Sequence, residues 1–183
     1  MNFCIQDSDI FLPKEKKYIN EIILGSHFPF YWIPHQVRQD EHGWFCHTLL
    51  KKRVELSDEG YAVKQLKDED WESTHGSFFI SIIQRFCKKH GLSFTQIYRG
   101  CLNLTIKSHA RESSPHTDHT FAHKSMIIYL NKSEGETVLL KNKKIIKKIK
   151  PAAFKILCFD GLLNHYIKYP PHGRRVIAVF TFN

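Results

Sequence analysis

SMIIYLN at residues 125–131 opens a series of short segments that are rich in β-branched and aromatic residues. The segments that follow are ETVLL (136–140), KIIKKI (144–149), FKILCF (154–159), NHYIKY (164–169) and RVIAVFTF (175–182). Ser-Glu-Gly, Pro and Asp-Gly breaks separate them, and IYRGCLNLTI (97–106) precedes them. Apolar segments of this kind between turn residues predict β strands, so the chain from about residue 95 onward is predicted to be almost all strand.

Two helices are predicted upstream of these strands. Pro13 in a first turn, isoleucines at helical spacing and Gly25 at the end predict a helix over residues 13–24. Residues 77–90 place apolar side chains on one face and end in lysines before Gly91, which predicts the second helix. Helices followed by many short strands predict an α+β protein whose strands form a double-sheet jelly roll or barrel.

The chain length of 183 residues predicts one domain spanning residues 1–183. Within this domain we expect a helical and loop-rich flank at residues 1–95 and a jelly-roll core at residues 96–183. The aromatic-rich segment 27–70 between the helices has weak periodicity, so it is predicted to form loops and edge strands.

Composition excludes several classes of protein. Hydrophobic residues make up 42% of the chain, which is enough to bury a core and excludes wholesale disorder. No apolar run approaches the about 18 residues of a membrane span, and the N-terminus lacks a basic region followed by an apolar stretch. The five cysteines are widely spaced without a CxxC pair, which predicts buried free thiols in a reducing, cytoplasmic setting.

The net charge is +9, and much of the excess lies in Lys141–Lys150, where six of ten residues are lysine. Alternation of these lysines with isoleucines predicts a hairpin with one solvated face. The charge is also compatible with an acidic partner such as nucleic acid.

Candidate metal ligands lie in the second half of the chain. His116 and Asp118 are two residues apart, so on a strand both side chains would point to the same side. His165 lies on the penultimate predicted strand, and Arg175 begins the last strand ten residues later. Two histidines and one carboxylate on one face of an octahedral ion suit non-haem Fe(II) oxygenases, and a buried arginine can bind a carboxylate of a co-substrate.

Two further groups of histidines offer alternatives. The first could form a metal cluster at near-helical spacing and consists of His116, His119 and His123. This cluster is disfavoured because it leaves His165 and Arg175 unexplained. The second could line a substrate rim, although partly buried loop anchors are the favoured interpretation, and consists of His35, His42 and His47.

These segments together resemble the 2-oxoglutarate and Fe(II)-dependent dioxygenases, on the side of the prolyl-hydroxylase-like enzymes. The resemblance covers residues from about 98 to 182. It is carried by HTDH (116–119), YLNKSEG (129–135), PxxFKILCFDG (151–161), His165 and GRRVIAVF (173–180). The resemblance implies a double-stranded β-helix, which is a jelly roll with N-terminal flanking helices.

The resemblance also implies roles for individual residues. The iron ligands, through which catalysis would run, would be His116, Asp118 and His165. Arg175 would pair with the distal carboxylate of 2-oxoglutarate, and the phenol of Tyr129 would donate to the same group. Arg174 is the alternative arginine, because aligning the last strand on its aromatic residues favours it and only one of two neighbours on a strand can point inward.

The implied cofactors are Fe(II), 2-oxoglutarate as co-substrate, and O₂. The implied reaction oxidises 2-oxoglutarate to succinate and CO₂ and hydroxylates a C–H bond of a second substrate. Asn103, on the strand entering the site, could contact the co-substrate or the substrate, although a plain polar strand residue is the commoner case.

The likeness to prolyl hydroxylases favours a peptidyl, prolyl-type or free amino-acid residue as substrate. Residues 27–70 and 106–115 are expected to form the mouth of the pocket. An AlkB-type nucleic-acid demethylase is the alternative enzyme, supported by the basic charge, although Thr181 stands near the position where those enzymes typically carry a second arginine. A non-catalytic basic jelly roll that binds through residues 141–150 is the alternative outside the enzymes, and no membrane partner is expected.

Overall fold

The computed structural model describes residues 3–34, 43–51, 54–56, 62–65 and 71–183. Two helices and a π-helical turn occur in it: α1 (Pro13–Tyr18), η1 (Ile19–Ile23) and α2 (Gly76–His90). The strands are β1 (Cys4–Asp7), β2 (Tyr31–Ile33), β3 (Trp44–Leu50), β4 (Val54–Leu56), β5 (Ala62–Gln65), β6 (Ile97–Ile106), β7 (Lys124–Tyr129), β8 (Thr137–Lys141), β9 (Lys144–Ile149), β10 (Lys155–Asp160), β11 (Asn164–Ile167) and β12 (Arg174–Phe182).

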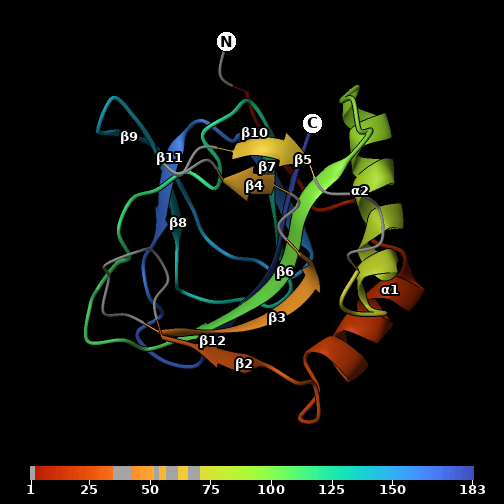
Figure 1. Cartoon of the computed structure of the whole chain (residues 1–183). Coiled ribbons are helices and arrows are strands. Elements are labelled where there is room, and N and C mark those ends of the chain that lie inside the picture. Colours follow the sequence, from red (N-terminus) through yellow and green to blue (C-terminus); the bar gives the residue numbers. More distant parts are fainter. Residues whose placement is uncertain (1–2, 35–42, 52–53, 57–61, 66–70) are drawn as a thin grey trace.

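The strands form two antiparallel sheets that face each other, and β4 and β5 form a separate pair. The larger sheet has the order β1-β10-β7-β12-β6-β3-β2, and the smaller has the order β11-β8-β9. Inward-facing residues of both sheets pack into one core, as Tyr129 and Ile177 do with Leu139 and Ile149. The predicted jelly roll is therefore confirmed, with α1 and α2 lying along the outer face of the larger sheet (Figure 1).

Strands β7, β10 and β12 of the larger sheet are buried on both faces, which explains their nearly unbroken apolar sequences. On β12, Ile177 and Val179 point into the core between the sheets, whereas Ala178 and Phe180 pack toward the helices. Such strands read as continuous hydrophobic runs because alternate side chains enter two different cores. All five cysteines are free thiols, as predicted, and all except Cys4 are buried.

Both predicted helices are confirmed. The helix predicted at residues 13–24 comprises α1 and η1, with Pro13 at its first position. The second runs from Gly76 to His90 and ends at Gly91, whose φ of 62° is the left-handed conformation that glycine adopts readily. Arg85 of α2 donates to the Glu15 carboxylate of α1 at 2.6 Å, which joins the two helices. Within the described part of the chain, no helix is long and apolar enough to cross a bilayer.

The lysine-rich segment forms the predicted hairpin of β8 and β9. Its turn is Asn142-Lys143, and both residues have positive φ. The predicted alternation holds only in part, because Ile145 and Ile146 are both about half exposed and Ile149 alone is buried. The pairing register shifts between Leu139 and Leu140 of the partner strand, and β9 is an edge strand with one neighbour.

The prediction of loops and edge strands at residues 27–70 is wrong for β3. This strand lies inside the larger sheet, between β6 and β2, whereas β2 is the edge strand. Trp44 and Cys46 of β3 enter the core between the sheets, and Leu49 enters the core under the helices. Because both faces of β3 are buried, its sequence lacks the alternation that marks a half-exposed strand.

Replacing Gly100 of β6 by alanine is expected to destabilise the fold by about 1–3 kcal/mol, because overpacking a core costs that much. A Cβ atom at this position would lie 2.7 Å from the Phe180 ring and 3.5 Å from Cβ of Leu50. Urea unfolding of the variant measures the loss, and an unchanged midpoint and slope would contradict the expectation.

Candidate metal centre

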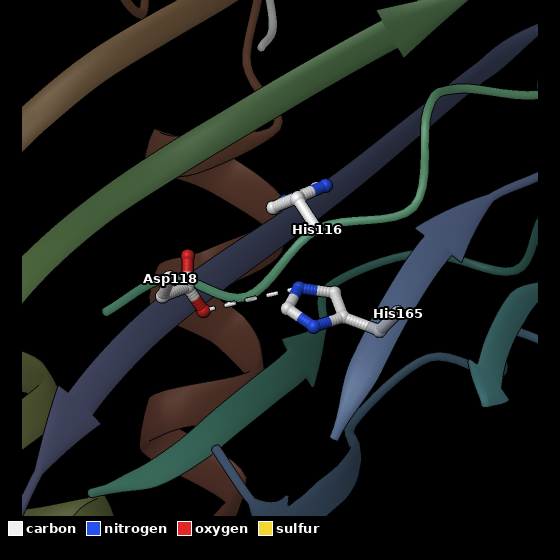
Figure 2. A group of neighbouring side chains, drawn as sticks. All are labelled: His116, Asp118 and His165. Atoms are coloured by element: carbon white, nitrogen blue, oxygen red, sulfur yellow. Dashed lines mark ion pairs between the residues drawn. The ribbon is translucent and has the colours of Figure 1, made fainter. Parts of the chain in front are cut away.

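Three candidate ligands from two segments converge at the β11 edge of the smaller sheet. The backbones of His116 and His165 exchange two hydrogen bonds, of 3.0 and 2.8 Å, which tie the segment after β6 to β11. One potential donor atom from each of His116, Asp118 and His165 lies within 4.8 Å of the other two. Figure 2 shows the Asp118 carboxylate directed toward the His165 ring, with His116 beside them.

The Asp118 carboxylate is held by partners on both of its oxygens. Arg99 Nη1 donates to Oδ1 at 2.9 Å, and Ser125 Oγ donates to Oδ2 at 3.2 Å. Oδ2 also lies 3.8 Å from Nε2 of His165. Burial by itself would raise the pKa of the Asp118 carboxyl, but His165 and Arg99 outweigh burial and keep the pKa below its usual range. The carboxylate is therefore charged at neutral pH.

The two imidazoles are oriented by backbone carbonyl groups. Nδ1 of His116 lies 3.0 Å from the Ser114 oxygen, and Nδ1 of His165 lies 3.4 Å from the Leu163 oxygen. A proton on Nδ1 in each ring leaves Nε2 as the lone-pair donor, which is the usual arrangement around a metal-binding histidine. Burial lowers the pKa of His165 to about 4, although Asp118 opposes the shift. His165 is thus neutral at pH 7, as a metal ligand must be.

The three side chains open into a cavity of about 230 Å³ between the two sheets. Trp44, Ile127, Ile177 and Val179 form its apolar walls. Its polar lining comes from the three candidate ligands together with Arg99, Asn103, Thr105, Thr117 and Arg175. Two imidazole nitrogens and one carboxylate oxygen are the donor set that suits a divalent transition metal such as Fe(II), so the residues present fit this ion.

Arg175 is a buried cation in the same cavity, with 1% of its surface exposed. Its Nη2 donates to Thr137 Oγ1 at 2.8 Å, and its guanidinium lies 5.7 Å from the centre of the Tyr129 ring. Among the described residues, neither Arg175 Nε nor Thr105 Oγ1 has a hydrogen-bond partner, although both atoms are buried. Unsatisfied buried polar groups cost free energy, so these atoms fit an anionic ligand that would satisfy them.

Comparison with known proteins places this geometry in a fold group. No protein-family model and no curated protein matches the sequence. A 2OG-Fe(II) oxygenase family oxidoreductase from Burkholderia pseudomallei is similar over 100% of this chain and 84% of its own, with a TM-score of 0.72 and 15% identity. A Pseudomonas putida prolyl-4-hydroxylase is similar over 98% of this chain and 92% of its own, with a TM-score of 0.58 and 12% identity.

A third structure is a prolyl hydroxylase from Trichoplax adhaerens in complex with a peptide fragment of the hypoxia inducible factor oxygen degradation domain. It is similar over 98% of this chain and 83% of its own, with a TM-score of 0.62 and 15% identity. The chain has the fold of the 2OG-Fe(II) oxygenases. The double-stranded β-helix that the sequence resemblance implied is therefore confirmed.

Within this oxygenase fold, the two neighbouring arginines lie on opposite sides of β12. Arg175 points into the cavity, whereas Arg174 is exposed and its Nη2 donates to the Leu24 oxygen at 2.7 Å. Alternation along a strand requires this division. Of the two arginines, Arg175 has the placement that binding of a ligand in the cavity requires.

The other two residues expected to meet the co-substrate differ in position. The Tyr129 hydroxyl is fully buried and donates to Thr137 Oγ1 at 2.8 Å, and Tyr129 is not among the residues that line the cavity. Burial raises the pKa of Tyr129 to about 12, although Arg175 opposes the shift. Asn103 does line the cavity, and its buried Oδ1 has no hydrogen-bond partner among the described residues.

The alternative histidine cluster does not form. His119 Nε2 lies 2.8 Å from Thr181 Oγ1, and His123 Nδ1 lies 2.8 Å from the Phe121 oxygen. In the part of the chain that the structure describes, only the group of His116, Asp118 and His165 has metal-binding spacing. The two other histidines, His119 and His123, instead pack with Phe121 and Tyr98 in an aromatic cluster.

The histidines considered for a substrate rim are placed only in part. His47 is buried, with Nδ1 2.9 Å from the Pro29 oxygen and Nε2 2.8 Å from Ser73 Oγ. These contacts agree with its interpretation as a loop anchor. His35 and His42 lie outside the described residues.

Three polar residues of the site were not singled out from the sequence: Arg99, Thr105 and Thr137. A signal existed for the first two, because Arg99, Asn103 and Thr105 are separated by even numbers of residues on the predicted strand 97–106. Even spacing places all three on one face of a strand. No comparable signal marks Thr137, whose role depends on the smaller sheet lying against Arg175.

Thr137 accepts hydrogen bonds from both Tyr129 and Arg175, so we expect it to position the guanidinium. Replacement by valine preserves the shape but removes the acceptor. A hydrogen bond to a charged group contributes about 1.5–3 kcal/mol, so the affinity for 2-oxoglutarate is expected to fall about tenfold or more. Calorimetric titration of the Mn²⁺-loaded variant measures this change, and an unchanged dissociation constant would exclude the positioning role.

Proposed function

We propose that the protein is an Fe(II)- and 2-oxoglutarate-dependent dioxygenase that couples oxidative decarboxylation of 2-oxoglutarate to hydroxylation of a second substrate. One observation carries the proposal: a cavity of about 230 Å³ contains both the three-donor group and a buried arginine with an unsatisfied donor. A metal group alone fits many functions. A metal group beside a carboxylate-binding cation fits a diacid co-substrate in particular.

His116, Asp118 and His165 would hold the iron through Nε2, a carboxylate oxygen and Nε2. An iron ion held by these three residues would keep further coordination positions for the co-substrate and O₂. When bound, iron supplies activation of O₂ with electrons from 2-oxoglutarate. Arg175 would bind the distal carboxylate of 2-oxoglutarate, with Thr105 close enough on the neighbouring strand to share this group.

Other residues of the site orient the Asp118 carboxylate and exclude water from the cavity. Ser125 and Arg99 fix the Asp118 carboxylate from two sides, which keeps one orientation available to the metal. The apolar side chains of Ile127 and Ile177 line the cavity beside the candidate ligands. Exclusion of water from this volume strengthens the electrostatic attraction between Arg175 and a bound carboxylate.

A peptidyl, prolyl-type or amino-acid residue is the proposed primary substrate, supported by the likeness of the fold to two prolyl hydroxylases. The basic charge of the chain is the observation that favours an AlkB-type demethylase, and the last strand weighs against it. At the position on the last strand where a second arginine is typical of those enzymes, Thr181 is buried and bonded to His119. A non-catalytic jelly roll would leave the unsatisfied donor of Arg175 without explanation.

The test begins with anaerobic titration of the apoprotein with Fe(II) and then 2-oxoglutarate. A new visible absorption band that saturates at one equivalent of metal is expected, followed by release of succinate when air is admitted. A chelator in excess over the metal should stop the release of succinate, and Fe(II) added in excess over the chelator should restore it. Absence of both the band and succinate would refute the dioxygenase function.

A further inference from the structure

Arg99 and Arg175 mark two ends of the cavity. Arg99 lies on β6 opposite Thr181 of β12, and Arg175 lies on β12 opposite Thr105 of β6. The two positions are therefore six residues apart along the strands, or about 20 Å at about 3.3 Å per residue. The co-substrate is proposed to pair with Arg175. Arg99 therefore lies in the part of the cavity that remains for the primary substrate.

Arg99 is only partly used by its protein partners. Nη1 donates to Asp118 Oδ1 at 2.9 Å, and the guanidinium also contacts the Cys101 thiol. Its side chain is 27% exposed, whereas that of Asp118 is 4% exposed. A guanidinium has five N–H donors in a planar fork, so the contacts with Asp118 and Cys101 leave further donors on a side chain that lines the cavity.

The charges of the site do not balance without a further anion. Among the described residues that line the cavity, Asp118 is the single acid, while Arg99 and Arg175 are both cations. A divalent metal ion and doubly charged 2-oxoglutarate cancel each other. One positive charge then remains, and a low-dielectric cavity makes such an unbalanced charge costly.

We infer that Arg99 is a specificity-determining residue that binds a carboxylate of the primary substrate beside the metal site. The inference rests on the proposed dioxygenase function. One carboxylate neutralises the surplus charge, and its two oxygens match the guanidinium fork. A phosphate monoester carries close to two negative charges and would leave an excess in the opposite sense. The substrate is thus a free carboxylic acid, such as an amino acid with an acidic side chain and a net charge of about −1, or an acidic side chain in a peptide.

The first experiment detects binding without turnover. Protein loaded with Mn²⁺ and 2-oxoglutarate under anaerobic conditions is mixed with propionate, or with propionamide as its neutral counterpart, and broadening of the proton NMR lines by Mn²⁺ is recorded. The proton lines of propionate are expected to broaden to a saturating value, whereas those of propionamide are expected to stay unchanged. Arg99→Gln is expected to weaken propionate binding about 10- to 100-fold, the size of a lost charge-assisted hydrogen bond.

Two variants separate specific from general effects. Arg99→Lys keeps the cation beside Asp118 and is expected to retain part of the affinity for propionate. Lys88→Gln removes the same charge from an exposed position on α2, outside the cavity lining, and is expected to bind propionate like the unmodified protein. Equal broadening by Arg99→Gln and the unmodified protein would overturn the inference.

Calorimetry with 2-oxoglutarate distinguishes this inference from the proposed function. Because Arg99 also holds the Asp118 carboxylate, Mn²⁺ is first added to Arg99→Gln until electron paramagnetic resonance shows that the metal site is full. At full metal occupancy the variant is expected to bind 2-oxoglutarate, because this ligand is proposed to pair with Arg175. Failure of the unmodified protein to bind 2-oxoglutarate would refute the proposed function. If 2-oxoglutarate binds normally and Arg99→Gln does not weaken the binding of propionate, the role of Arg99 is refuted and the proposed function stands.

Succinate release then identifies the source of the carboxylate. Free amino acids are compared with their amides, and capped peptides that contain Asp or Glu are compared with the same peptides carrying Asn or Gln. Stimulation by one of the two acidic sets, lost in the matched amides, supports the inference and names the source. Stimulation by neutral peptides or by nucleoside monophosphates instead would overturn it.

Discussion

Replacement of His165 by alanine is expected to abolish succinate formation and to weaken metal binding by more than about 100-fold. Loss of a residue that merely orients a metal ligand costs about 10- to 100-fold, and loss of a ligand itself should cost more. His165 is buried, and its Nε2 faces the Asp118 carboxylate at 3.8 Å, so no exposed neighbour can replace it readily. Asp118→Asn should have a similar effect because it removes the charged donor.

Titration with Mn²⁺ followed by electron paramagnetic resonance measures the metal affinity, and succinate assays measure turnover. His172→Ala is the matched control, since this histidine is exposed and outside the cavity. Circular dichroism establishes that each variant is folded. Turnover of His165→Ala at the level of the control, with unchanged metal affinity, would show that the metal binds elsewhere.

Replacement of Arg175 by methionine is expected to raise the dissociation constant of 2-oxoglutarate about 10- to 100-fold, as the loss of charge-assisted hydrogen bonds requires. Methionine keeps much of the apolar stem of the arginine and removes the charged guanidinium. Burial lowers the pKa of this guanidinium. Metal affinity should be unchanged because Arg175 contacts no candidate ligand in the hydrogen bonds described.

The adjacent Arg174 provides the control for this variant. Arg174→Met makes the same chemical change on the exposed side of β12. There the Arg174 guanidinium donates a hydrogen bond to the Leu24 oxygen. Isothermal titration of both Mn²⁺-loaded variants with 2-oxoglutarate compares the two positions. Weaker binding in Arg174→Met, with normal binding in Arg175→Met, would transfer the anchoring role to Arg174.

Local pattern was sufficient for much of the fold. The strand predicted at residues 97–106 has the bounds of β6, and the helix predicted at residues 77–90 differs from α2 by one residue. Helical and strand periodicity depend on neighbours within a few positions, so they are readable in the chain itself. The pattern failed at β3, where burial of both faces removes the alternation on which such a prediction depends.

The order of chemical groups along the chain likewise indicated the site. His116, Asp118 and His165 were selected by residue type and by position relative to predicted strands, and the structure brings them within metal-binding distance of one another. Their assignment as iron ligands stays a proposal that the variants above test. The choice between Arg174 and Arg175 could not be made from type or spacing, because neighbouring arginines differ only in which face of β12 they occupy.

Long-range contacts account for what the chain alone left open. The donation from Arg99 to Asp118 and the position of Thr137 between Tyr129 and Arg175 join residues on different strands. Such contacts depend on strand register and on how the two sheets face each other, and a shift of one residue would turn each side chain to the other face. Residue types and local periodicity specify which groups are present, whereas pairing across the sheets specifies which of them meet.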